Sequence, residues 1–85
     1  MEPIERIKFD VSLDHISVVM DRLNKRLGNV IKTIEKDADV SQMIVDIPTR
    51  GLFGFQSELM AMLGLELKIE TEFLGYQEYK GELDV

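Results

Sequence analysis

The chain has 85 residues, no cysteine, one histidine and a formal net charge of −6 from 16 acidic and 10 basic side chains. This length suits one domain, and the lack of cysteine excludes disulfides and thiolate metal sites. The negative charge argues against general affinity for nucleic acid, which depends on basic surface that displaces counterions. No apolar run is long enough to span a membrane, and the N-terminus is charged from residue 2. We therefore expect a cytoplasmic protein without a signal peptide, metal or cofactor.

The first third of the chain predicts a strand followed by a helix. Residues 3–11 alternate between apolar and polar side chains, as in a strand with one buried face, and the inward residues are Ile7, Phe9 and Val11. Ser12 is suited to cap a helix that begins near Leu13. Apolar residues then recur at helical spacing, at Ile16, Val19, Met20, Leu23 and Leu27. Gly28 is the expected C′ residue, where a left-handed backbone is common.

The middle of the chain predicts a hairpin. Residues 29–35 and 40–47 are predicted strands, and the polar segment 36–39 between them is short enough to make the pair antiparallel. In the second of these strands, alternation places Met43, Val45 and Ile47 on one face. Pro48 ends this strand, so residues 48–51 are predicted to form a loop.

A second helix and a final strand complete the predicted elements. Residues 52–63 have helical spacing, and the side chains expected to face the sheet are Leu52, Phe53, Phe55, Leu59 and either Met62 or Leu63. Gly54 in the first turn costs about 1 kcal/mol relative to alanine, which favours close backbone packing there, and Gly64 is the expected end. Residues 66–73 alternate strictly, with Leu67, Ile69, Thr71 and Phe73 on the apolar face. Residues 80–85 are expected to fray.

The predicted order is β-α-β-β-α-β, which indicates a single α+β domain of ferredoxin-like fold over residues 1–85. In this fold a four-stranded antiparallel sheet has the order 4-1-3-2, and both helices cover one face. We expect a monomer, with dimerisation through the edge of the strand at 29–35 as the alternative.

The segment IPTRGLFGFQSELMAM at residues 47–62 resembles the fifth domain of the TypA/BipA translation GTPases, whose pattern is close to IPTRGLIGFRSELLTM. Elongation factor G and its relatives have a looser version, with a phenylalanine-glycine pair at Phe53-Gly54. The resemblance extends to EPIERIKFDV (2–11), LNKRLGNV (23–30) and FLGYQEYKGEL (73–83), so it covers nearly the whole chain.

This resemblance implies a ferredoxin-like domain that helps to seat a GTPase on the ribosome without catalysing any reaction itself. The GTP-binding sequence G-x-x-x-x-G-K-[ST] is absent from the 85 residues. We therefore expect a ribosome-associated binding domain, isolated from its GTP-binding domain, whose partner is ribosomal RNA or protein.

The chain departs from the family pattern at residues 63–67. The family has a glycine- and arginine-containing turn there, whereas this chain has LGLEL. Leu27 and Gln56 also stand where the family often has a basic residue. These changes remove positive charge that an RNA contact would use, so the alternative function is a designed or redesigned scaffold with no native activity.

Two short basic segments are the candidate contact residues. Arg50 and Gly51 lie before the second predicted helix, where an arginine and the helix amides could meet a phosphate. Lys25 and Arg26 lie at the end of the first helix, where cations also complement the helix dipole. No catalytic, cofactor-binding or metal-binding residue is predicted.

Overall fold

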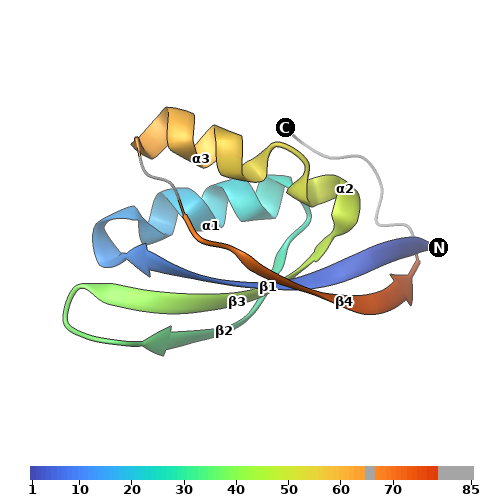
Figure 1. Ribbon diagram of the computed structural model, residues 1–85, viewed down its shortest axis with the longest axis horizontal. Helices are drawn as coiled ribbons and strands as arrows, with labels where there is room; N and C mark the ends of the chain where they lie inside the picture. Colours follow the sequence, from blue (N-terminus) through green and yellow to red (C-terminus); the bar gives the residue numbers. More distant parts are fainter. Residues whose placement is uncertain (65–66, 79–85) are drawn as a thin grey trace.

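The computed structural model describes residues 1–64 and 67–78 and is shown in Figure 1. A short 3-10 turn, η1, joins the first strand to the first long helix. The elements in chain order are β1 (Glu2–Ser12), η1 (Leu13–His15), α1 (Ile16–Lys25), β2 (Asn29–Glu35), β3 (Val40–Pro48), α2 (Thr49–Leu52), α3 (Phe55–Leu63) and β4 (Glu70–Gln77).

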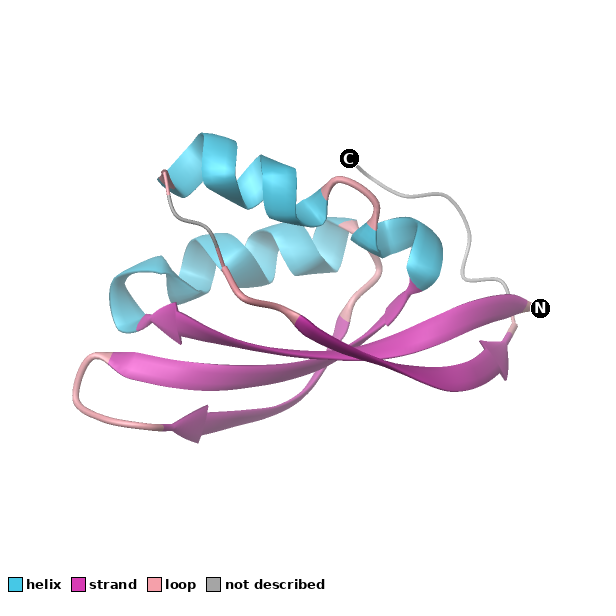
Figure 2. Ribbon diagram, in the orientation of Figure 1, coloured by secondary structure: helices cyan, strands magenta, loops and turns pink. Residues whose placement is uncertain are grey.

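The four strands form one antiparallel sheet in the order β2-β3-β1-β4, which is the predicted order. Figure 2 shows the helices on one face of this sheet and none on the other. The ferredoxin-like prediction is therefore confirmed. None of the helices in the described part of the chain is long and apolar enough to cross a membrane.

Alternation along β1 and β3 builds the core. Antiparallel pairing places Ile7 opposite Val45 and Phe9 opposite Met43, so apolar side chains of both strands share the face beneath the helices. Val19 and Leu23 of α1 are fully buried against this face. From α3, the ring of Phe55 meets the ring of Phe9 edge to face, with centroids 6.2 Å apart. The inward faces predicted for residues 3–11 and 40–47 are confirmed.

The end of α1 differs from the prediction in one residue. Leu27, and not Gly28, takes the left-handed conformation, with φ of 65°. The Gly28 amide donates to the Leu23 carbonyl at 2.8 Å and the Leu27 amide to Asn24 at 3.2 Å, which is the Schellman arrangement. Gly28 suits the tight space that follows, because a Cβ there would lie 3.1 Å from the Leu23 carbonyl oxygen and 3.2 Å from Val45 Cγ1.

The predicted helix over residues 52–63 is broken in two, and the predicted loop at 48–51 contributes to the first piece. α2 is a single turn, and α3 starts only at Phe55. Gly54 between them has φ of 78°, which any other residue except asparagine or aspartate rarely adopts. The expected close packing at Gly54 is wrong, because a Cβ there would meet nothing nearer than Arg26 at 4.0 Å. The left-handed turn points Phe53 outward, so its predicted burial is also wrong.

The final strand begins later than predicted. Pairing with β1 starts at Glu70 opposite Lys8, and β4 continues to Gln77. Leu67 is buried and Ile69 packs against the core, as expected. Phe73 is 59% exposed, so the predicted burial of its side chain is wrong. Its ring meets Tyr76 edge to face at 5.6 Å on the edge strand. Residues 65–66 of the predicted strand, and the predicted fraying at 80–85, lie outside the described residues.

Candidate functional site

The two basic segments predicted from the sequence meet at one end of the helical layer. Figure 1 shows the end of α1 beside α2. Lys25 is the last residue of α1, and Arg26 follows it. Arg50 and Gly51 both lie within α2, so Arg50 belongs to a helical turn and not to a loop before it. The fold brings Arg26 and Gly51 into direct contact, a juxtaposition for which the local sequence holds no signal.

Arg26 turns inward. The residue is only 6% exposed, and its guanidinium donates to two backbone carbonyls of the α2–α3 connection. Nη1 lies 3.0 Å from the Gly51 oxygen and 2.7 Å from the Phe53 oxygen. Nε lies 3.4 Å from a carboxylate oxygen of Glu58, and the guanidinium carbon lies 5.7 Å from the centre of the Phe55 ring. The planar fork of an arginine suits this set of partners, which the single ammonium of a lysine could not satisfy together.

Gly51 allows α2 to pack closely against Arg26. It is buried, and a Cβ built on it would overlap the carbonyl oxygen of Arg26 and lie 3.0 Å from Ile47 Cγ1. Arg26 therefore contacts Gly51 twice: its guanidinium donates to the Gly51 carbonyl, and its own carbonyl oxygen lies against the position of a Gly51 Cβ. Only a residue without a side chain allows α2 to sit this close to the end of α1.

Arg50 and Lys25 point their charges differently from Arg26. Arg50 Nε lies 2.6 Å from a carboxylate oxygen of Glu2, which ties α2 to the start of β1. The Arg50 side chain is 27% exposed, against 8% for Glu2. Lys25 is half-buried and makes no ion pair with another described residue. Of the four predicted residues, these two have partly exposed cationic side chains.

A comparison with sequence families and one with solved structures show what kind of domain this is. The sequence family described as elongation factor G C-terminus matches residues 1–84. The chain belongs to this family. The resemblance to the fifth domain of translation GTPases is thereby confirmed, and so is the family's α+β fold.

Several named proteins share this domain. The large ribosomal subunit assembly factor BipA is 31% identical in Bacillus subtilis, over 72% of this chain, and 32% identical in Haemophilus influenzae, over 94% of it. Elongation factor 2 of Thermoplasma acidophilum is 25% identical over 98% of the chain. A crystal structure from Thermus thermophilus superposes with a TM-score of 0.79 at 22% identity, covering 93% of this chain and 12% of the other. The chain spans 10%, 13% and 11% of the Bacillus, Haemophilus and Thermoplasma proteins.

In this elongation factor G C-terminal domain, Phe53 is a surface residue that the sequence pattern did not predict. Phe53 is 88% exposed, although it was expected to pack against the sheet together with Leu52 and Phe55. The signal that could have found it is the glycine that follows, because Gly54 allows the left-handed turn that ends α2. The backbone carbonyl of the same residue accepts a hydrogen bond from Arg26.

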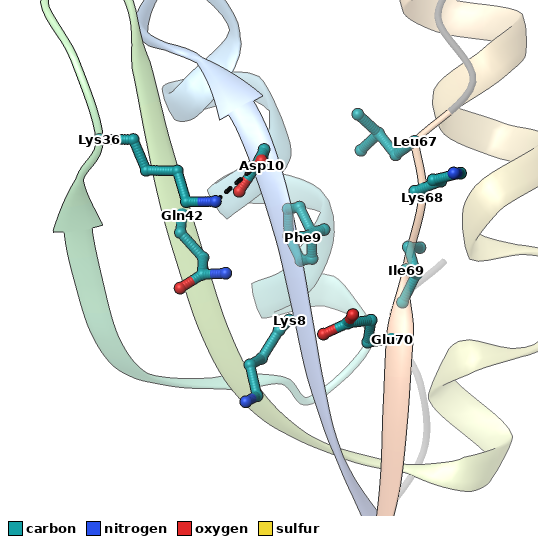
Figure 3. Close-up of a pocket in the computed structure, with 9 residues that line it drawn as sticks. All are labelled: Lys8, Phe9, Asp10, Lys36, Gln42, Leu67, Lys68, Ile69 and Glu70. Atoms are coloured by element: carbon teal, nitrogen blue, oxygen red, sulfur yellow. Dashed lines mark hydrogen bonds and ion pairs between the residues drawn. The ribbon is translucent and has the colours of Figure 1, made fainter.

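A hollow of about 620 Å³ lies elsewhere in the domain, where the ladder between β1 and β4 begins. Figure 3 shows it between Lys8, Phe9 and Asp10 of β1 and the segment 67–70. Lys36 Nζ lies 3.3 Å from Asp10 and neutralises it. The lining mixes lysines, carboxylates and apolar groups without a nucleophile held by a base. It has neither the residues nor the geometry of a catalytic site.

The open face of the sheet carries an ion pair of its own. Arg6 and Asp46 face each other across β1 and β3, with two parallel contacts of 2.8 and 3.1 Å. The hydrogen bond and charge of Asp46, aided by Glu72, raise the pKa of the Arg6 guanidinium. Among residues 1–64 and 67–78 there is no group of three or more histidine, cysteine, aspartate or glutamate side chains placed to hold a metal ion.

Proposed function

We propose that this chain is a non-catalytic domain of a cytoplasmic translation GTPase and that it binds the ribosome. The observation that supports this most is the family match over residues 1–84, together with relatives that are elongation factors and a large ribosomal subunit assembly factor. Hydrolysis of GTP belongs, in this proposal, to a different domain, because the phosphate-binding sequence G-x-x-x-x-G-K-[ST] does not occur in these residues.

The proposed contact surface is the junction of α1 and α2. Arg50 and Lys25 supply partly exposed cationic side chains, and phosphate oxygens are the usual partners of such side chains on RNA. Arg26 and Gly51 act indirectly, because their interactions with each other fix the position of α2. With two partly exposed cations among the described residues of this junction and a net charge of −6, binding should be weak and sensitive to salt.

Co-sedimentation of the 85-residue chain with purified ribosomes tests this proposal. Binding is expected at low salt, with affinity falling as salt rises. Arg50→Ala should weaken binding and reduce the slope of log affinity against log salt by about one, the contribution of one phosphate contact. Lys36→Ala is the matched control, because it removes the same charge at the far end of the β2–β3 hairpin, where Lys36 already pairs with Asp10.

The alternative is an inert scaffold, and the same experiment separates the two. The LGLEL sequence at residues 63–67 favours the alternative, since it lacks the basic residue of the family turn. A folded chain that stays in the supernatant at low salt, with or without the Arg50 side chain, would refute ribosome binding and leave the scaffold.

A further inference from the structure

The two sides of β1 are paired over different lengths. On one side β3 pairs with β1 as far as Ser12, whereas on the other side β4 pairs with it only as far as Lys8, opposite Glu70. Among the described residues, none pairs with β1 beyond Lys8 on the β4 side. The stretch of β1 from Phe9 to Ser12 is therefore a free strand edge, which is able to take up a partner strand.

The segment just before β4, residues 67–69, is chemically suited to that edge. Continued by three residues, the observed register gives the pairs Phe9–Ile69, Asp10–Lys68 and Val11–Leu67. The first and third pairs are apolar and belong to the face beneath the helices, where Leu67 and Ile69 already pack against the core. The second pair belongs to the open face of the sheet and joins opposite charges.

Charges on the open face follow the same register. The observed ladder sets a cation of β1 opposite a carboxylate of β4 twice, in the pairs Arg6–Glu72 and Lys8–Glu70. At the next outward-facing position the sign is reversed in both strands, with Asp10 in β1 and Lys68 in the segment before β4. Opposite charges directly across an antiparallel pair stabilise it, whereas like charges destabilise it. The double reversal therefore keeps the facing charges complementary if the ladder continues.

In the structure, the segment is held toward α3 instead. The side-chain amide of Gln56 donates to the Leu67 carbonyl oxygen at 2.6 Å. Asp10 pairs with Lys36 at 3.3 Å, and Figure 3 shows the Lys68 side chain directed away from β1. The hollow of about 620 Å³ lies between the segment and β1, and another of about 600 Å³ lies between the segment and Gln56. Room to move toward β1 is therefore present.

We propose that residues 67–69 are a conformational strap with two positions. In the open position, which the structure shows, Gln56 holds the Leu67 carbonyl. In the closed position the ladder between β1 and β4 extends to Val11, Asp10 exchanges Lys36 for Lys68, and the strap fills the hollow beside β1. Leu67 and Ile69 face the core in both positions, so closure moves no apolar side chain into water.

A disulfide trap tests the closed register, because the chain has no cysteine of its own. Residues directly opposite across an antiparallel pair have Cα atoms about 4.5 to 5.5 Å apart, which a disulfide can bridge. Asp10→Cys combined with Lys68→Cys is therefore expected to oxidise to an intramolecular disulfide.

Two further cysteine pairs calibrate this trap. Lys8→Cys with Glu70→Cys sets the rate for a ladder that is already formed. Asp10→Cys with Glu70→Cys is the negative control, because diagonal neighbours are about 7 to 8 Å apart and lie beyond the reach of a disulfide. Oxidation of the Asp10→Cys, Lys68→Cys pair faster than this diagonal pair supports the strap, and oxidation no faster than the diagonal pair overturns it.

Removal of the Gln56 amide tests what holds the open position. Gln56→Leu keeps a side chain of similar size on α3 and removes the donor. It should speed oxidation of the Asp10→Cys, Lys68→Cys pair about fivefold, the change in an equilibrium that one ordinary hydrogen bond makes. Ser57→Ala, at the next exposed residue of α3, is the matched control and should leave the rate unchanged. A rate that Gln56→Leu does not change would contradict the two-position strap.

Discussion

Arg26 is the residue whose loss should be most informative, because it is a buried cation whose partners are mostly backbone groups. Arg26→Met keeps much of the apolar stem and removes the guanidinium. The Gly51 and Phe53 carbonyls then lose their donor, and Glu58 loses its counter-charge. The expected result is a less stable protein in which the α2–α3 connection is no longer fixed.

The size of the effect follows from those three contacts. A buried polar group left without a partner costs about 1 to 3 kcal/mol, and the Gly51 carbonyl lies in buried surroundings. The Phe53 carbonyl is only partly buried, so water can replace part of its bond. The Glu58 contact is long, at 3.4 Å, and the carboxylate side chain is 23% exposed, so it adds little. We expect a loss of about 3 kcal/mol in the free energy of unfolding.

Urea unfolding followed by far-ultraviolet circular dichroism measures this change. A domain of this size is stable by roughly 4 to 13 kcal/mol, so the variant should still fold. The urea midpoint should fall by about 3 M, since the unfolding slope of a small domain is about 1 kcal/mol per molar urea. The urea midpoint of Arg26→Lys should lie between those of the unaltered chain and Arg26→Met, because one ammonium group cannot reach every partner of the guanidinium.

The control for this prediction is Arg22→Met on the same helix. Arg22 lies 3.7 Å from Asp21, whose side chain is 58% exposed, so its loss should cost less than about 1 kcal/mol. An Arg26→Met protein within about 0.5 kcal/mol of the unaltered chain would refute the view that Arg26 holds the connection.

Four further substitutions test the break between α2 and α3 and the ion pair on the open face of the sheet. Gly54→Ala should cost about 1 to 2 kcal/mol in urea unfolding, because φ of 78° disfavours any side chain; no loss would mean that the left-handed turn is absent. Phe55→Ala should cost about 3 to 5 kcal/mol and Phe53→Ala less than about 0.5, and similar thermal shifts for the two would contradict the break between α2 and α3. Arg6→Gln should cause a small loss by removing the Asp46 pair. An arginine is charged from about pH 7 to 10 even without the rise in pKa that Asp46 causes, so that loss should stay constant over this range, and a loss that disappears there would contradict the assignment.

The sheet was predictable because period-two patterns fix which side chains face the core. In residues 3–11 and 40–47 a shift of one position would move every apolar side chain into water, so the sequence allows one register. The short polar segment 36–39 left only an antiparallel hairpin between its neighbours. The order of strands then followed from the succession of strands and helices.

The break at Gly54 was not predictable from spacing alone. Leu52, Phe55 and Leu59 satisfy the helical period whether the helix is continuous or interrupted. A tertiary contact also lies at this point, because Arg26, far away in sequence, donates to the carbonyls of Gly51 and Phe53 just before the break. Local sequence carries no sign of such a contact. The same limit applies to the end of α1, where Leu27 is left-handed and a Cβ on the following Gly28 would lie 3.2 Å from Val45 Cγ1, a tertiary contact that local sequence does not encode.

The start of β4 shows a different limit. Alternation continues from Leu67 to Phe73, yet pairing with β1 begins only at Glu70. Where a strand starts to pair depends on where the chain arrives after α3, which alternation does not encode. Exposure of Phe73 has a related cause, since it lies on an edge strand where a side chain on the apolar phase need not be covered.

The candidate site was predictable in composition but not in geometry. All four predicted residues lie at the junction of α1 and α2, since Lys25 and Arg26 end one helix and Arg50 and Gly51 belong to the other. The sequence could not assign Arg26 and Arg50 different roles. An arginine that binds backbone carbonyls and one that is partly exposed give the same sequence pattern at the end of a helix. Whether they contact the ribosome stays a prediction.

Competition with an intact relative is the most direct test of ribosome binding by this domain. In the Bacillus subtilis BipA protein, the residues that match this chain make up 10% of the length. If this chain uses the family's binding position, ribosomes that hold it should release it as BipA is added, and the amount released should rise to completion. Ribosomes that retain the chain at saturating BipA, or that never bind it at low salt, would contradict the account.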